Sequence, residues 1–505
     1  MAHVIGTERR HKKCEDLNLI STASDTVSGL VDSIQKELKE LPSLPSNCSI
    51  YRVPKPLRKI KPGAYRPRMV SIGPFHRYKK HLQPMEAHKL RYLNDLLSRK
   101  SQPNLGDYVK AVTKLEYRAR QCYSEIIQLK SEDEFVKMML IDGCFILELI
   151  LRTNNPHEPR RRDDLILNAT WMSQVIKSDL ILLENQLPFF VLESLYKRFT
   201  GNSNSSGLDT LISRFFQDFV PQPQSITPES SQFRRISEVA KNVLISVTRW
   251  PSMKKNQGEV VDPLLKVEAA STIKDKETPA AEEPEEENSK AKHLLDFVRD
   301  LLLQSFSAKP ENRGKFALTR SATQLNEASV EFVKLPKTCL LNITFSKGVL
   351  KIPTMRIEDW TEPLLRNLIA FEQSHDDYSH EITDYAAFID GLVNSPKDVE
   401  LLEKKGIIES LLGEPEEVAA LFNSLLKEVS PTIMDGNYYF SSICHELEEH
   451  YKIPRHKWKA SLMRNYCNTP WAFISFLAAV FLLILTVVQT ICSILQVTIS
   501  SQPYM

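Results

Sequence analysis

Glycine is scarce in this chain, where it makes up 15 of the 505 residues. No glycine-rich phosphate-binding loop occurs, and both the GxSxG motif of serine hydrolases and the HExxH motif of zinc peptidases are absent. These absences exclude the classes of enzyme that such motifs define. Serine, histidine and aspartate are plentiful, but no spacing in the sequence brings them together as a catalytic group.

Cysteine is also sparse, and its eight residues form no CxxC pair and no dense framework. The pattern predicts reduced and mostly buried thiols, which favours a cytosolic main body. The N-terminus has no apolar stretch of the kind that marks a cleaved signal peptide. The cysteines are Cys14, Cys48, Cys122, Cys144, Cys339, Cys444, Cys467 and Cys492.

The net charge is only +2, but the charges are unevenly distributed. Residues 51–100 contain 14 lysines and arginines and two acidic residues, whereas residues 358–450 contain 21 acidic and five basic residues. Three interpretations stay open for the basic block: pairing with the acidic helices inside the fold, contact with anionic lipid, or binding of an acidic protein partner. No nucleic acid is expected, because the chain carries an acidic block of its own and a membrane segment.

The most informative stretch is residues 178–192, SDLILLENQLPFFVL. Its apolar residues recur at helical spacing, which predicts a buried helix. Pro188 predicts a break near residues 186–187. The polar triplet at 184–186 must find partners, since a buried polar group without them costs on the order of 2 kcal/mol. The competing interpretation is an unrecognised enzyme that uses buried carboxylates such as Glu184 and Glu372.

Three histidines, His76, His81 and His88, lie near Glu86 in the sequence. A metal site needs ligands that converge at helical or hairpin spacing. Pro84 separates His81 from His88, and no cysteine joins them. We expect solvated or capping histidines, and the sequence assigns no metal, cofactor-binding or catalytic residue.

The first part of the chain is predicted as a flexible tail over residues 1–24, followed by a helical body over 25–251. Residues 25–41 form an amphipathic pattern that we expect to pack on the core. Short strands are expected at 48–53 and 68–72. Helices are expected after Pro84, at 107–130 and at 132–152.

The second part begins with an acidic, proline-containing insertion over 252–291, predicted to be disordered. A second helical segment follows over 292–465. It contains a β-hairpin at 340–352, with Gly348 at its turn, and a helix that starts at Ser395-Pro396. Gly391 and Gly406 are expected at helix ends.

Residues 471–497 are uncharged and longer than the ~20 residues that a helix needs to cross a bilayer. They predict one transmembrane helix, a lipid bilayer as a partner, and a short tail at 498–505. Basic residues precede the span and none follows it, so the body is expected in the cytosol, with tail anchoring after synthesis. Four glycosylation sequons, at Asn47, Asn168, Asn204 and Asn342, point weakly the other way.

Several of these stretches together resemble the plant-specific domain of unknown function 247 family, which includes UPF0481-type membrane proteins. The resemblance covers about residues 48–497 and is carried by SDLILLENQLPFFVL, IYRVPKPLRKIKPGAYRPRMVSIGPFH, HLQPMEAHKLRYLNDLL and HLLDFVRDLLL. The chain departs from the family pattern at Ala328-Ser329, where Ala-Gly is expected.

The resemblance implies no established activity. Some grass members of the family are associated with self-incompatibility as pollen-side determinants. By analogy, we expect a mainly α protein, anchored in a membrane by one C-terminal helix, that acts in recognition or signalling through an unidentified protein partner rather than as an enzyme. The sequence does not distinguish the plasma membrane from an endomembrane.

Overall fold

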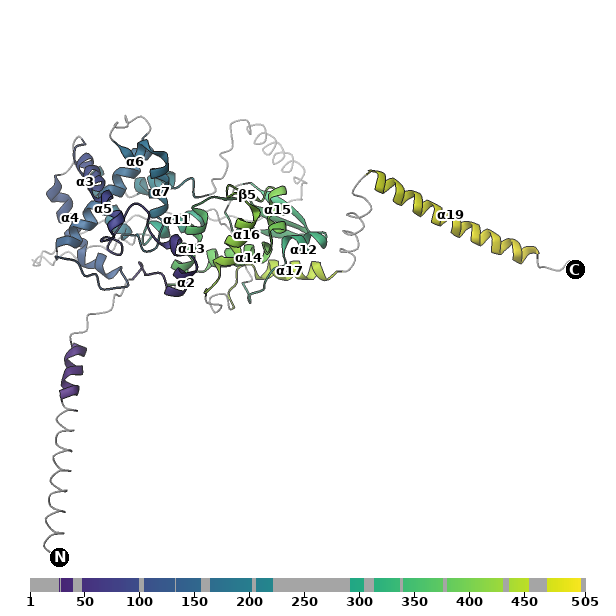
Figure 1. Ribbon diagram of the computed structural model, residues 1–505, viewed down its shortest axis with the longest axis horizontal. Helices are drawn as coiled ribbons and strands as arrows, with labels where there is room; N and C mark the ends of the chain where they lie inside the picture. The colour runs from purple at the N-terminus through teal and green to yellow at the C-terminus, as the bar shows by residue number, and fades with distance from the viewer. Residues whose placement is uncertain are drawn as a thin grey trace, which may run out of the picture.

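The structure, a computed structural model, is mainly helical, with a few short strands in one compact body and a long C-terminal helix outside it (Figure 1). The predicted fold class is confirmed. The two segments of the body share one apolar core, which extends from Ile50 to Leu447. The structure describes residues 27, 29–39, 48–99, 104–131, 133–155, 164–201, 206–220, 291–303, 313–336, 339–375, 379–429, 436–453 and 470–500.

Helix α5 (Asp133–Asn154) is the central helix of the first half of the body. Every residue from Met138 to Ile150 is buried, as expected for a helix that is surrounded on all sides. Helices α3, α4, α8 and α9 pack against it. The other helices of this half are α2 (Lys55–Ile60), η1 (Pro62–Tyr65), η2 (Lys80–Leu82), α3 (Pro84–Leu97), α4 (Leu105–Gln121), α6 (Leu165–Asn168), α7 (Thr170–Asp179), α8 (Phe189–Thr200) and α9 (Ser206–Phe215).

Helix α13 (Thr361–Glu372) is the central helix of the second half of the body. It is buried from Leu364 to Glu372 and packs against α11, α14 and α16. It also contacts η1 of the first half, so the two halves meet along this helix. The other helices of this half are α11 (Leu294–Leu303), α12 (Ala322–Glu327), α14 (Glu381–Leu392), α15 (Pro396–Lys404), α16 (Pro415–Leu425) and α17 (Ser441–Lys452).

The predicted hairpin is present, with a shorter first strand. Strand β2 (Thr344–Ser346) pairs antiparallel with β3 (Val349–Pro353), and the turn between them has positive φ at Lys347 and Gly348. Strand β1 (Glu331–Leu335) pairs parallel with the other edge of β3. A second pair of parallel strands joins β4 (Met355–Ile357) to β5 (Ile408–Ser410).

Helix ends follow the predicted capping chemistry in two places. Ser395 and Asp398 form a capping box at the start of α15, and Gly406 has a φ of 70° just beyond its end. Gly391 is the penultimate residue of α14, where an added Cβ would come within 2.7 Å of Thr319. Ser329 keeps the left-handed backbone that glycine would favour, with a φ of 63°.

Two predictions for residues 25–53 are wrong. The helix at residues 29–39 does not pack on the core: its apolar side chains Leu30, Ile34 and Leu38 are exposed. Residues 48–53 form no strand, since Ile50 makes only an isolated bridge to Tyr123. Most of the predicted N-terminal tail, the acidic insertion and the C-terminal tail lie outside the described residues.

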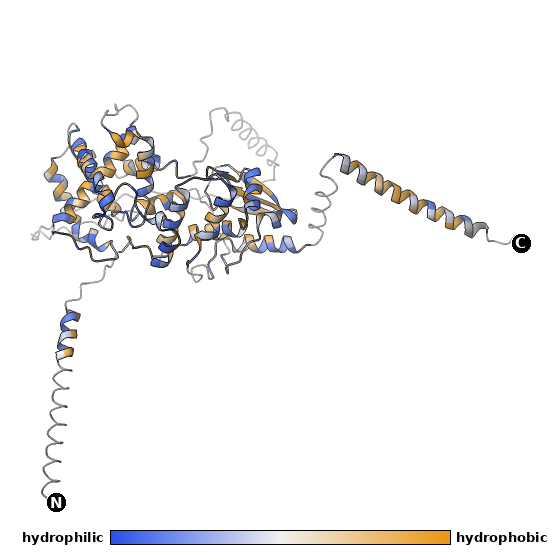
Figure 2. Ribbon diagram, in the orientation of Figure 1, coloured by the Kyte–Doolittle hydropathy of each residue, from blue (hydrophilic) through white to orange (hydrophobic). Residues whose placement is uncertain are grey.

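Helix α19 (Pro470–Ser500) contains the predicted transmembrane segment. Residues Leu477–Gln496 form one helix that is long and apolar enough to cross a membrane, and none of this segment is buried against the body. Figure 2 shows hydrophobic residues along most of α19, whereas hydrophilic residues are interspersed over the helices of the body.

Candidate functional site

Residues 178–192 are interrupted, as Pro188 predicts, but the interruption begins earlier and is longer than the break expected near residues 186–187. Helix α7 ends at Asp179 and α8 begins at Phe189. The residues between them, 180–188, which we call the central loop, have no regular structure, and each of residues 180–187 is at most 3% exposed. Side chains here take the place of helical hydrogen bonds: the Gln186 amide donates to the carbonyls of Leu180 and Leu182.

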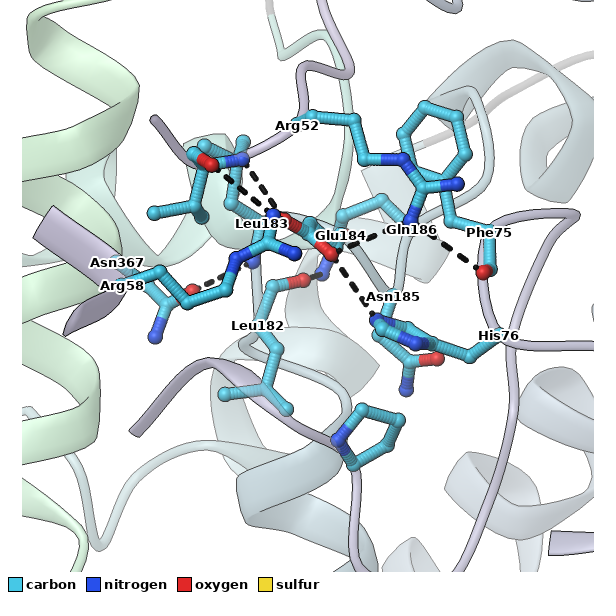
Figure 3. Close-up of polar contacts among 12 residues, drawn as sticks. Arg52, Arg58, Phe75, His76, Leu182, Leu183, Glu184, Asn185, Gln186 and Asn367 are labelled. Carbon is cyan, nitrogen blue, oxygen red and sulfur yellow. Dashed lines mark hydrogen bonds and ion pairs between the residues drawn. The ribbon is translucent and has the colours of Figure 1, made fainter. Parts of the chain in front are cut away.

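Glu184 lies in the middle of the central loop and binds the first segment of the body (Figure 3). Its Oε1 accepts a hydrogen bond from the Val53 backbone N–H at 2.8 Å and another from Arg58. Its Oε2 lies 3.5 Å from Nη1 of Arg52 and 3.4 Å from Nε2 of His76. Burial alone would raise the pKa of Glu184, but His76, Arg58 and the Val53 N–H together hold it below its usual value.

The other two residues of the polar triplet are also fully engaged. The Asn185 carbonyl accepts from the Ile72 N–H at 2.7 Å, and its amide donates to the carbonyls of Val70 and Asp179. The side-chain carbonyl oxygen of Gln186, Oε1, accepts a hydrogen bond from the Leu295 N–H at 3.3 Å. The prediction that the triplet holds a break in the chain is therefore confirmed, with partners both within the central loop and its flank and in distant segments.

Asp179 explains why residues 68–72 are not the strand that the sequence predicts. Its two carboxylate oxygens accept from the backbone N–H groups of Arg68, Met69 and Val70 at 2.7–2.9 Å. These N–H groups therefore bond to a side chain rather than to a neighbouring strand. Burial raises the pKa of Asp179 to about 6, and the three N–H donors offset only part of that rise.

A further buried pair, which the sequence did not single out, joins the same segment to α5. Asp142 accepts from the Gly73 N–H at 2.9 Å and from Lys89 at 2.7 Å. Lys89 is fully buried and also donates to the Ser71 carbonyl and to Glu86. The signal available in the sequence was an aspartate inside the apolar run of α5.

Glu372, the other candidate carboxylate, is the last residue of α13 and is likewise surrounded by hydrogen-bond donors. Its Oε1 accepts from Arg299 at 2.9 Å and from the Ile382 N–H at 3.1 Å. Its Oε2 accepts from the backbone and hydroxyl of Thr383 at 2.9 and 2.7 Å. Glu372 is completely buried, and Arg299 is 5% exposed.

The geometry limits what these carboxylates can do chemically. A general base or a nucleophile needs a lone pair directed at a substrate. Glu184 and Glu372 instead accept from protein donors on both oxygens. Each carboxylate thus joins segments that are separate in the sequence.

A cavity of about 420 Å³ lies elsewhere, between the two halves of the body. Phe219 and Trp360 stack in its wall, with their ring centroids 4.4 Å apart. Neither Glu184 nor Glu372 lines it. The lining residues are Gln174, Gln217, Asp218, Phe219, Val220, Leu302, Leu340, Thr354, Met355, Arg356, Glu358, Trp360, Thr361, Leu364 and Leu365.

The structure does not bring the three histidines together as ligands. His76 is buried against Glu184, His81 contacts the Pro67 carbonyl at 3.2 Å, and His88 lies 3.4 Å from Arg91. Burial lowers the pKa of His76, and Glu184 offsets part of this effect. Among the described residues, no group of three or more histidines, cysteines or acidic residues could hold a metal ion.

The basic block does not pair mainly with the acidic helices of 358–450, so the first of the three interpretations is wrong as a general account. Lys61 and Glu362 form such a pair at 3.2 Å. The other ion pairs that the described basic residues of 51–100 make end on carboxylates of α3, of the segment after α4, of α5 and of the central loop. They are Glu86, Glu125, Glu134, Asp142, Glu148 and Glu184.

The fold and the site define a class: a helical body whose buried carboxylates join distant segments, with one apolar C-terminal helix of membrane-spanning length. Comparison with known proteins gives the family. The chain belongs to the domain of unknown function 247 family, plant proteins of unknown function, whose model matches residues 50–485. The resemblance seen in the sequence is thereby confirmed.

Two curated relatives are similar over nearly their whole length, and both are from Arabidopsis thaliana. UPF0481 protein At3g47200 is 31% identical over 489 residues, which cover 95% of this chain and 91% of that protein. Putative UPF0481 protein At3g02645 is 24% identical over 527 aligned positions, covering 90% of this chain and 92% of that protein. No solved structure matches.

Proposed function

We propose that this protein is a single-pass, tail-anchored membrane protein whose helical body acts in recognition or signalling on the cytosolic side and has no enzymatic activity. The observation that carries the proposal is the segment Leu477–Gln496, a helix without a charged residue and without contact to the body. A soluble protein exposing so much apolar surface would aggregate, whereas a bilayer would cover it.

The orientation follows from flanking charge. Five basic residues precede the helix, and residues 497–505 contain no lysine or arginine. Lysine and arginine near a span are retained on the cytoplasmic side. The basic residues are Lys452, Arg455, Lys457, Lys459 and Arg464.

A recognition role without catalysis is supported by the state of the buried carboxylates. Glu184 and Glu372 are occupied by protein donors, and the cavity of about 420 Å³ includes neither. Residues 29–39 expose an apolar stripe that includes Leu30, Ile34 and Leu38, a feature typical of surfaces that bind partners. A self-incompatibility-like role rests on the family analogy alone.

Extraction of the full chain from plant membranes tests the anchor. We expect it to stay in the membrane at alkaline pH, where peripheral proteins are released, and to be released when Leu483 and Leu485 are both replaced by Arg, because each charge is costly in hydrocarbon. The matched control places two arginines at Leu411 and Leu318, which are exposed on the body. Release of the unaltered chain would contradict the proposal.

A further inference from the structure

The polar residues of the membrane-spanning segment all lie on one side of α19. Within Leu477–Gln496 each polar residue lies three or four residues from another of them. Residues at this spacing share a helix face. The other side chains of the segment are alanine, valine, leucine, isoleucine, phenylalanine and one cysteine. The polar face consists of Thr486, Gln489, Thr490, Ser493 and Gln496.

The two glutamines differ from the threonines on this face. The hydroxyl of Thr486 donates to the Leu482 carbonyl at 2.8 Å, and that of Thr490 donates to the Thr486 carbonyl at 2.8 Å. The threonines are therefore satisfied within their own helix. Gln489 and Gln496 are exposed, and no hydrogen bond joins either side chain to another of the residues that the structure describes.

A glutamine in hydrocarbon needs a partner, because its amide carries two donors and an acceptor and finds no water there. Leu477–Gln496 is the one candidate span among the described residues, so the described part of the chain offers no second helix to cover this face. A helix from another molecule would supply the partner that the described residues do not. Polar side chains at such positions join transmembrane helices.

A second copy of this chain is the occupant that fits the amides. A primary amide both donates and accepts, so the same residue on a two-fold related helix satisfies it. Parallel packing of two copies places equivalent residues at the same depth. We propose that two copies of this chain pair in the membrane through the polar face of α19, with Gln489 and Gln496 hydrogen-bonding across the interface. This inference rests on the proposed function, which places α19 in a bilayer.

Cross-linking of the full chain in phosphatidylcholine vesicles maps the interface. In a Cys492→Ala background, a second substitution places cysteine either on the polar face, as Ser493→Cys, or on the opposite face, as Leu495→Cys. The two sites differ by only about 3 Å in depth. We expect a disulfide-linked dimer, located at residue 493 by mass spectrometry, to form at least ~5-fold more from Ser493→Cys.

The glutamines are tested by measuring the dimer fraction at increasing protein-to-lipid ratio, with single-molecule photobleaching of the labelled full chain. Replacing Gln489 and Gln496 by Leu is expected to weaken dimerisation by about tenfold, in line with interhelical hydrogen bonds in membranes. The control replaces Ile491 by Leu and Leu495 by Ile on the opposite face and is expected to leave the dimer fraction unchanged.

The outcomes separate this inference from the proposed function. A chain retained in alkali-washed vesicles but monomeric at every ratio would overturn the dimer and leave the anchor standing. Equal cross-linking at residues 493 and 495 would also overturn it, because no defined face would then be buried. A chain washed out of the vesicles would contradict the proposed function itself.

Discussion

Glu184 and Glu372 are buried to the same degree but are enclosed differently. Glu372 pairs with Arg299, which is 5% exposed. It also accepts hydrogen bonds from N–H groups that lie only 10 and 11 residues further along the chain. Glu184 pairs with Arg58 and Arg52, which are 31% and 35% exposed. It also accepts a hydrogen bond from an N–H group 131 residues away in the sequence. Both centres join segments that are separate in the sequence, but the Glu372 centre is closed to solvent and the Glu184 centre opens to it.

The comparison shows that a buried carboxylate in an apolar run does not by itself indicate chemistry. In both centres the carboxylate accepts from backbone N–H groups that have no acceptor in a strand or helix. The energetic difference lies in the cation: a guanidinium at the surface can return to water when its partner is removed, and a buried one cannot.

The largest effect is expected from Glu372→Gln. The substitution keeps the shape but leaves the buried Arg299 with Glu381, 2.7 Å away, in place of two carboxylate partners. We expect this to cost up to ~5 kcal/mol of unfolding free energy. Denaturant unfolding of the full chain in detergent micelles, followed by circular dichroism, measures the loss. Glu409→Gln, at an exposed position of β5, is the control and should change stability by less than ~0.5 kcal/mol.

Glu184→Gln should cost less, ~1–3 kcal/mol, because Arg52 and Arg58 can be hydrated after the change. The same unfolding experiment compares the two variants directly. If Glu184→Gln proved more destabilising than Glu372→Gln, the exposure of the arginines would not be what distinguishes the centres.

The sequence predicted the fold around these centres only in part. Helices α5 and α15 and the hairpin β2–β3 were predicted correctly, because residue spacing, helix caps and turn residues, all local in the sequence, determine them. The strand predicted at 68–72 and the extent of the break in 178–192 were wrong, because these backbone segments bond to side chains distant in the sequence. Those side chains are Asp179, Asn185 and Asn367. Nothing local distinguishes such a segment from a strand or a helix.

The candidate residues follow the same rule. The triplet at 184–186 was identified as polar and in need of partners, but the partners could not be named. The Asp142–Lys89 pair was missed, and the pairing of basic with acidic blocks was overestimated, because block charge says nothing about which carboxylate is nearest. The parallel pairs β1–β3 and β4–β5 join segments 18 to 53 residues apart, which periodicity does not encode.

A pH-dependent effect should come from His293, which lies between the two centres. It contacts the Ser49 carbonyl at 3.1 Å and packs its ring on Phe371, next to Glu372. Burial, followed by the charge of His375, lowers the pKa of His293 to about 3. The unfolded chain binds a proton below pH ~6.5 that the folded chain does not, so this residue's contribution to stability is lost as pH falls from 6.5 towards 3.

His293→Asn retains an acceptor for the start of α11 and removes the titration. Between pH 6 and 4 the unfolding free energy of the unaltered chain should fall more steeply than that of the variant, by up to ~1.4 kcal/mol per pH unit. The difference between the two slopes is the measured quantity, because burial raises the pKa of Asp384 to about 7 and gives the opposite trend in both proteins. Identical slopes would contradict the assignment.

The smallest effect is expected from salt. Raising NaCl from 0.1 to 1 M should reduce the cost of Glu184→Gln by up to ~1 kcal/mol, because ions reach Arg52 and Arg58. The cost of Glu372→Gln should stay constant, since Arg299 is shielded from solvent. An equal salt response of the two variants would remove the distinction between an open and a closed centre.

Orientation in the membrane is the measurement that tests the central claim most directly, because a cytosolic body and a luminal body would meet different partners. The full chain is expressed in plant cells, intact vesicles are treated with protease, and the protein is checked for an endoglycosidase-sensitive mass shift. Asn168 and Asn342 are exposed on the body and would report luminal exposure. The account predicts digestion of the body and no glycan shift. A protected body carrying glycans at these residues would contradict it and would place recognition on the luminal or extracellular side.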